Sequence, residues 1–315
     1  MKQTKFKNRI LSGLIILCLS LLLRLWRLDE VPVSLTGDEL AFSYNAWSIW
    51  QTGKDEYGIS WPLTFKSFGD YKVPLPVYLQ LLPVGIFGIN EWSVRLPITI
   101  IASITPLLVF LLIKTLLTYS WKNPKYSLNI SAQHSTIISF TASMMLVFSP
   151  WHIHFSRGGW EVTLGVFFGI LGLYSLANYT NKLEVISKEK IIYFLISVIS
   201  FSLGMYSYHA SKVYIPLLII AWFGTIFLDI FFAPRPLDYK NYKKHIFSVV
   251  IFISMFTVFS ISALTSLTNI TGNSRFVSST VSKFLSSPTI IQQLKDPNID
   301  SHFYQSRLIR WYFGT

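Results

Sequence analysis

The sequence is poor in charged residues and nearly lacks cysteine. Only 13% of its 315 residues are charged, whereas a typical soluble domain carries about 25%. The single cysteine, Cys18, excludes a disulfide framework within one chain. Hydrophobic residues make up 51% of the chain and the mean hydropathy is +0.46. The scarcity of charge therefore indicates a protein with much of its surface facing lipid.

Acidic residues are scarcer than basic ones, 15 against 27, which gives a formal net charge of +12. Such an excess can signal nucleic-acid binding. Here, however, the lysines and arginines occur in short clusters between apolar runs, which is typical of the positive-inside rule of membrane proteins rather than of a nucleic-acid-binding face. We therefore expect membrane lipids as partners, and no nucleic acid.

Seven apolar stretches predict about seven transmembrane helices, because about 20 apolar residues cross a bilayer. They cover approximately residues 10–28, 92–117, 136–148, 160–179, 191–206, 213–232 and 245–264. The first could belong to a secretory signal, but Leu25-Trp26-Arg27-Leu28 follows it in place of a small-residue cleavage site. We expect an uncleaved span and an all-α polytopic membrane protein, with residues 1–264 as its transmembrane module.

The basic clusters give the topology. With a cytoplasmic N-terminus, every cluster falls on the inner side of the plasma (cytoplasmic) membrane. The clusters lie within residues 2–9, 114–125, 182–190 and 235–244. The long loop 29–91 and the turns at His152 and His209 then lie outside. The tail 265–315 is expected to be extracytoplasmic too, and to be cut before the rest of the protein.

The long outer loop carries two short amphipathic stretches, Glu39–Gln51 and Pro74–Phe87. Both are too short to span and suit helices that lie in the membrane interface. Thr36 is the expected N-cap of the first. A loop of this length between two spans is usually functional.

Three arginines lie at the ends of the first two spans. We expect Arg24 and Arg27, near the end of the first span, to extend their charged groups to the interface. Arg95, near the start of the second, is expected to pair with an acidic residue of the outer loop. That pair would fix the loop on the second span.

Four segments occur in a familiar order and spacing on the expected outer side. They are Thr36-Gly37-Asp38-Glu39, Gly69-Asp70-Tyr71-Lys72-Val73-Pro74, Phe87-Gly88-Ile89-Asn90-Glu91-Trp92-Ser93-Val94-Arg95-Leu96-Pro97 and Ser149-Pro150-Trp151-His152-Ile153-His154-Phe155-Ser156-Arg157. This pattern resembles the GT-C class of polyprenyl-phosphate-sugar-dependent glycosyltransferases, which includes the protein O-mannosyltransferases and the lipid A aminoarabinose transferases. The resemblance covers most of residues 10–235 and implies a GT-C-like transmembrane catalytic module.

The resemblance implies transfer of a sugar from a polyprenyl-phosphate donor to an acceptor on the outer face, with inversion at the anomeric carbon. The acceptor could be a protein, a glycan or a lipid. Asp38 takes the place of the family's loop aspartate. Because a glycosyl phosphate already carries a good leaving group, the reaction needs a general base for the acceptor's proton and cations for the phosphate. Asp38 is the expected base, with Glu39 either beside it in catalysis or structural.

Three basic residues are candidates for the phosphate. Lys72 matches the basic position of the family's loop motif, and Arg157 could bind phosphate through two nitrogens. Lys212 is the third. Glu161 stands where relatives have a second acidic residue, although at four residues from Arg157 it could instead pair with that guanidinium.

The remaining polar candidates on the outer side are His154, His209 and Tyr71. With Asp38 or Glu161, the histidines could form a metal site, but polar side chains at a Trp- and Tyr-rich interface explain them more simply. We therefore assign no cofactor and leave a divalent metal ion open. Asp38 itself could merely stabilise a helix N-terminus.

Two other functions compete with the enzyme. One is a transporter or flippase of a lipid-linked or anionic solute, and the other is a non-catalytic partner in envelope assembly. Transporters place their binding residues near the bilayer midplane. The apolar stretches here hold almost no ionisable residue at their centres, which favours chemistry at the membrane surface.

Overall fold

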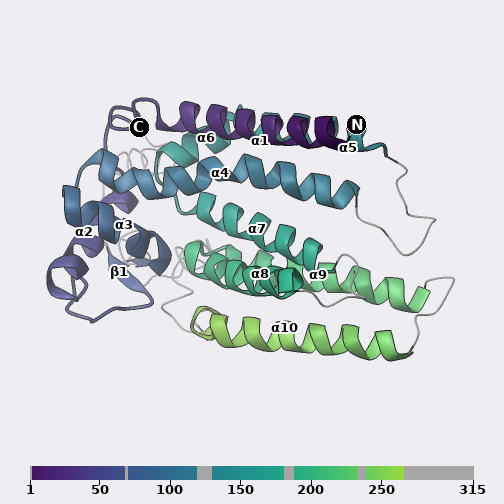
Figure 1. Cartoon of the computed structure of the whole chain (residues 1–315). Coiled ribbons are helices and arrows are strands. Elements are labelled where there is room, and N and C mark those ends of the chain that lie inside the picture. Colours follow the sequence, from purple (N-terminus) through teal and green to yellow (C-terminus); the bar gives the residue numbers. More distant parts are fainter. Residues whose placement is uncertain (1, 68–69, 119–129, 181–187, 233–238, 266–315) are drawn as a thin grey trace, which may run out of the picture. The chain divides into compact units, whose positions relative to one another are not determined.

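Long helices dominate the computed structural model, which describes residues 2–67, 70–118, 130–180, 188–232 and 239–265. Each of the seven expected apolar stretches is a helix (Figure 1). In chain order these are α1 (Lys2–Leu25), α4 (Glu91–Leu117), α5 (Ala132–Val147), α7 (Val162–Thr180), α8 (Lys188–Ser207), α9 (Ser211–Phe232) and α10 (Tyr239–Thr265). The predicted tail lies, apart from Thr265, outside the described residues.

Within the described residues, four helices are long and apolar enough to cross a membrane: α4, α7, α8 and the Ile246–Thr265 part of α10. A fifth span would combine α5 with the short helix α6 (Pro150–Arg157), which is bent from it by 54°. The apolar parts of α1 and α9 are shorter. These helices indicate a multi-pass membrane protein, and the full count of seven spans stays a prediction.

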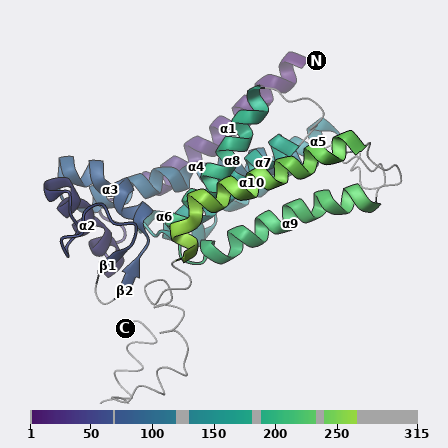
Figure 2. The ribbon, with the colours of Figure 1, turned by 90° about the horizontal axis from the view of Figure 1, so that it is seen from below.

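The expected outer loop folds into two helices and a small hairpin. Both helix predictions are confirmed, as α2 (Gly37–Thr52) and α3 (Pro74–Phe87). The two-stranded antiparallel sheet of β1 (Phe65–Ser67) and β2 (Asp70–Lys72) is an addition to the all-α expectation. These elements gather at one end of the long helices (Figures 1 and 2). Phe42, Ala46 and Ile49 of α2 pack there with Phe65 and Val77.

Two side-chain contacts fix how the ends of the long helices correspond. Thr99 Oγ1, near the start of α4, donates to the Ser156 carbonyl of α6 at 2.8 Å. Lys114 Nζ, near the end of α4, donates to Thr136 Oγ1 near the start of α5 at 2.9 Å. The connection between α5 and α7, which was expected outside, therefore lies at the opposite end of the long helices from Lys114. Which membrane face that end occupies stays a prediction.

The turn expected at His152 is instead helical, which corrects that prediction. Ser149 is the N-cap of α6 and its side chain accepts a hydrogen bond from the His152 backbone N–H. Pro150 follows at the first helical position, where its missing N–H costs no hydrogen bond. Cap and proline together start a new helix where the sequence indicated only the end of a span.

A glycine allows α7 and α8 to pack closely. A methyl group at Gly172 would stand 2.6 Å from the Phe201 ring of α8. Ser197 Oγ of α8 donates to the Gly172 carbonyl at 3.0 Å. Small residues of this kind let helix backbones approach within a membrane, where packing and hydrogen bonds replace the hydrophobic effect.

We therefore expect Gly172→Ala to lower the thermal midpoint of unfolding in detergent, because Phe201 must move to admit the methyl group. Overpacking of this kind typically costs about 1–3 kcal/mol. Gly224→Ala is the matched control, since no atom lies within 4 Å of a methyl group there. An unchanged midpoint for Gly172→Ala would mean that the α7–α8 contact is looser than described.

Candidate functional site

The two residues ranked first for catalysis and phosphate binding are in direct contact. Lys72 Nζ donates to Asp38 Oδ1 in an ion pair. The Lys72 side chain is only 7% exposed, whereas that of Asp38 is 28% exposed. The carboxylate is thus the more exposed member of the pair.

The hairpin explains how a lysine comes to lie so deep. Lys72 is paired in register with Phe65, so both side chains point to the same face of the sheet. Phe65 packs into the apolar cluster between α2 and α3. Lys72 follows it inward, and Asp38 at the start of α2 supplies the opposite charge. The partial positive charge at the N-terminal end of a helix also attracts a carboxylate.

Glu39 holds the start of α2 and does not face the open side of the site. Its Oε2 accepts from the Thr36 backbone N–H at 2.7 Å, which with Thr36 Oγ1 completes a capping box. Its Oε1 accepts from Arg95 Nε at 2.7 Å. The predicted N-cap and the predicted ion pair of Arg95 with an acidic loop residue are both confirmed. Of the two roles considered for Glu39, these contacts favour the structural one.

Arg95 also fixes the connection between α1 and α2. Its guanidinium is fully buried and donates from Nη1 to the carbonyls of Leu28 at 3.1 Å and Pro32 at 2.8 Å. Nη2 donates to the Ser34 carbonyl at 2.9 Å. One side chain of α4 thereby holds both the chain that leads into α2 and Glu39, the residue after Asp38.

The turn between α8 and α9 reaches the same place. His209 Nε2 lies 3.0 Å from the Tyr71 carbonyl oxygen, next to Lys72 in β2. Lys212 is the second residue of α9, three positions after His209, and its side chain is buried. Of the two expected candidates of this turn, His209 thus stands beside the strand that carries Lys72.

The start of α7 lies between these parts. A methyl group at Gly165 would meet Ser211 Oγ of α9 at 2.7 Å, and one at Gly159 would lie 3.6 Å from Glu39 Oε1. Glu161, which is buried, stands between the two glycines in the chain. The site is therefore assembled from four segments: the start of α2, the hairpin, the α6–α7 turn and the α8–α9 turn.

Arg157 is close by but its contacts differ from the expected phosphate clamp. Its Nη1 donates to the carbonyls of Leu23, Arg24 and Trp26, at 3.2, 3.3 and 2.6 Å. Its Nη2 donates to those of Arg27 and Val31, at 3.1 and 2.9 Å. Both terminal nitrogens cap the end of α1 and the connection after it. The alternative pairing with Glu161 is likewise not formed by these nitrogens.

These contacts predict that Arg157→Ala acts mainly on stability. Hydrogen bonds to charged groups contribute about 1.5–3 kcal/mol each, and five buried or partly buried carbonyls would lose the guanidinium as a donor. We expect a lower thermal midpoint and a smaller yield of monodisperse protein in detergent. Arg27→Ala is the control, since Arg27 is exposed and its side chain pairs with the exposed Glu30. A folded, equally stable Arg157→Ala would restore the phosphate-clamp interpretation.

Arg24 is buried inside the protein, which corrects the expectation that its charged group extends to the membrane surface. Its side chain is fully buried. Nη1 donates to the Val147 carbonyl at 3.3 Å and Nη2 to that of Leu146 at 3.2 Å, both at the end of α5. Nη2 also lies 2.9 Å from His152 Nδ1. The cation is offset by the negative end of the α5 dipole, a partner that has no sequence signature.

The histidines do not form the metal site considered above. His152 is buried against Arg24, whereas His154 is exposed on another side of α6. Among the described residues there is no group of three His, Cys, Asp or Glu side chains that could hold a metal ion. His209 remains beside β2 as a polar neighbour of Lys72.

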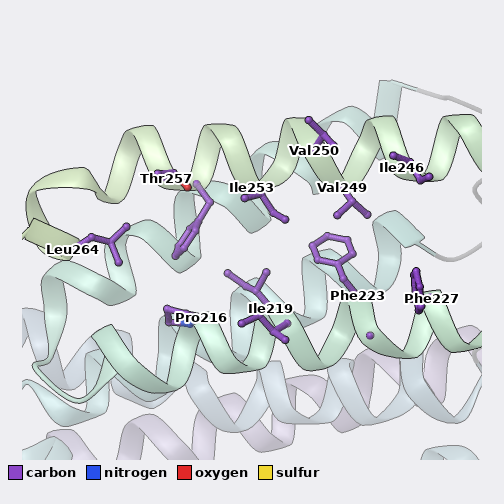
Figure 3. Close-up of a pocket in the computed structure, with 13 residues that line it drawn as sticks. Pro216, Ile219, Phe223, Phe227, Ile246, Val249, Val250, Ile253, Thr257 and Leu264 are labelled. Atoms are coloured by element: carbon purple, nitrogen blue, oxygen red, sulfur yellow. The ribbon is translucent and has the colours of Figure 1, made fainter. Parts of the chain in front are cut away.

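An apolar groove of about 570 Å³ lies between α9 and α10 (Figure 3). Pro216 and Leu264 line one end, and Phe227 and Ile246 line the other. Pro216 is one helical turn beyond Lys212, so the groove begins next to the candidate site and runs along α9 away from it. Its lining is almost entirely aliphatic and aromatic, which suits a hydrocarbon chain.

The comparisons with known proteins add no relative. No family model, no curated protein and no solved structure matches the chain.

Proposed function

We propose that the protein is an integral membrane glycosyltransferase that moves a sugar from a polyprenyl-phosphate donor to an acceptor on the extracytoplasmic face. The observation that carries this proposal is the ion pair of Asp38 and Lys72 in a site assembled from four separate segments. Those segments include the ones that resemble the GT-C class. The GT-C-like fold, the seven spans and the cytoplasmic N-terminus belong to the same proposal.

The chemistry needs few groups. The acceptor hydroxyl attacks the anomeric carbon, the carbon–oxygen bond to phosphate breaks, and the configuration inverts. Asp38 takes the acceptor's proton as general base. The lipid phosphate leaves with the bonding electrons, and its growing charge is offset by Lys72 and Lys212. No acid is required because a phosphate is already a good leaving group.

The contact of Lys72 with Asp38 has a consequence for the order of events. The Asp38 oxygen that accepts the hydrogen bond of the Lys72 ammonium is occupied, and is therefore less available to an acceptor hydroxyl. When the donor phosphate reaches Lys72, the lysine exchanges one anionic partner for another. The donor thus prepares Asp38 for the acceptor, which favours binding of the donor first.

The groove between α9 and α10 supports the same assignment. A donor phosphate near Lys212 would stand one turn from Pro216, where the groove begins. The apolar lining then offers the polyprenyl chain a path between two helices, with its charged head at the site. No comparable apolar path is needed by a protein that acts only as an assembly partner.

An assay with a radiolabelled polyprenyl-phosphate sugar in membrane vesicles tests the proposal. The active protein is expected to move label from the lipid fraction to an acceptor and to leave the lipid phosphate behind. Label that crosses the membrane while still attached to the lipid would instead identify a flippase. Label that stays in place would favour a non-catalytic partner in envelope assembly. Mass spectrometry of envelope glycans with and without the gene then identifies the sugar.

A further inference from the structure

A short loop before β1 exposes apolar side chains in a regular pattern. Along residues 57–63 every second residue is apolar and more than half exposed: Tyr57 55%, Ile59 56%, Trp61 59% and Leu63 54%. Water-facing loops rarely hold four large apolar side chains in this way, and contiguous exposed apolar surface usually marks a binding surface. The pattern therefore indicates a surface that is covered by a binding partner.

The loop is held in this conformation by its own polar groups. Asp55 is buried, and its Oδ1 accepts from the backbone N–H groups of Tyr57 at 3.0 Å and Ile59 at 2.8 Å. Asn45 of α2 binds Glu56 twice, through the Glu56 backbone N–H at 3.1 Å and its carboxylate at 3.3 Å. The apolar side chains are thus presented by a fixed backbone and are not exposed by chance.

The apolar loop continues onto α3. Trp61 stacks on Tyr78 with 6.2 Å between ring centroids, and the Tyr78 hydroxyl donates to the Pro62 carbonyl at 2.7 Å. Burial, with a smaller effect of Asp55, raises the pKa of Tyr78 to about 12, so the hydroxyl keeps its proton. Leu82 and Ile86 follow Tyr78 at helical spacing and are strongly exposed. We define the apolar platform as Tyr57, Ile59, Trp61, Leu63, Leu82 and Ile86.

Three observations identify what covers this platform. The helix α3 contains no charged residue, unlike the outer face of a helix in water. It leads within four residues into α4, which is apolar and long enough to cross a membrane, so a bilayer surface is close at hand. Lys54 and Lys66 are exposed on either side of the loop, and Lys66 Nζ lies 5.5 Å from the Tyr57 ring centroid. Aromatic side chains with flanking lysines suit the headgroup region.

We propose that the apolar platform inserts into the membrane interface, between the lipid headgroups and the acyl chains of the bilayer that the long helices cross. The loop then acts as a rigid anchor that sets the depth of the outer elements relative to the membrane. The proposal concerns lipid contact alone, and it holds or fails independently of the glycosyltransferase proposal.

The single cysteine makes a direct test practical. In a Cys18→Ser background, Ile59→Cys and Leu82→Cys are labelled with a nitroxide and the full chain is placed in phosphatidylcholine–phosphatidylglycerol vesicles. Ser60→Cys is the matched control, because Ser60 is bridged to Lys54 and points away from its neighbour Ile59. Accessibility to oxygen, which gathers in the bilayer, is compared with accessibility to a water-soluble nickel chelate.

We expect the oxygen-to-chelate ratio at Ile59→Cys and Leu82→Cys to exceed that at Ser60→Cys several-fold. A chelate accessibility equal to that of Ser60→Cys would show a platform in water and overturn the proposal. Low accessibility to both reagents would show a platform covered by protein, either a second copy or another part of this chain, and would overturn it equally. Thermal unfolding of each labelled variant verifies the fold, and either position alone suffices for the decision.

Discussion

Asp38→Asn is expected to abolish sugar transfer while leaving expression and membrane insertion intact. The amide is nearly isosteric with the carboxylate and its oxygen can still accept from Lys72. It cannot take a proton from an acceptor hydroxyl. A positioned general base contributes about 10²–10⁴-fold to a rate, and a loss in that range is expected in the vesicle assay with labelled donor.

The same assay on Asp29→Asn provides the control, because Asp29 is an exposed carboxylate of the α1–α2 connection. Its activity should be unchanged. Binding of the donor measured without acceptor should persist in Asp38→Asn, since both lysines proposed to bind the phosphate, Lys72 and Lys212, are retained. Full transfer by Asp38→Asn would remove the base assignment, whereas loss of folded protein would point to a structural role for the pair.

Local sequence signals predicted the parts of this site that depend on neighbours in the chain. Thr36 followed three residues later by Glu39 is a capping pattern, and the cap is present. The helices α2 and α3 were predicted from apolar residues at helical spacing. The seven long helices follow from runs of apolar residues. In each case the cause lies within a few residues of the effect, so one sequence is enough to see it.

The contacts of Arg24 and Arg157 could not be predicted in that way. Their partners are backbone carbonyls. Every residue carries one, so the sequence gives no signal of which carbonyls an arginine will bind. Arg157 lies more than 120 positions from the carbonyls that it binds. For an arginine near a membrane surface we expected either a phosphate partner or a position in the interface, because a guanidinium usually contacts anions or water. The end of a helix offers the same compensation inside the protein.

The hairpin was missed for a related reason. Its strands are three residues each, and Lys72 alone would not be expected to point inward. Only the pairing of Lys72 with Phe65 and the ion pair with Asp38 make the inward position favourable. The resemblance singled out Asp38 and Lys72 separately, and their ion pair is a contact that it did not predict.

Arg95→Met should be the most destabilising substitution in the outer elements. It removes a fully buried guanidinium and leaves Glu39, which is 2% exposed, as a buried carboxylate without its cation. Breaking a buried ion pair by removing one partner typically costs about 3–5 kcal/mol. The carbonyls of Leu28, Pro32 and Ser34 lose their donor as well. We expect little monodisperse protein in detergent and a strongly lowered thermal midpoint.

A double-mutant cycle with Glu39→Gln separates the two contributions. If the uncompensated carboxylate causes most of the loss, Arg95→Met combined with Glu39→Gln should be more stable than Arg95→Met alone, because no charge is left buried. If the three carbonyls dominate, the double variant should be no better. Arg95→Lys is a further test. The lysine ammonium keeps the positive charge, but it lacks the planar guanidinium that reaches all four partners of Arg95 at once. A stable, fully folded Arg95→Met would refute the interpretation that Arg95 fixes the α1–α2 connection and Glu39 in place.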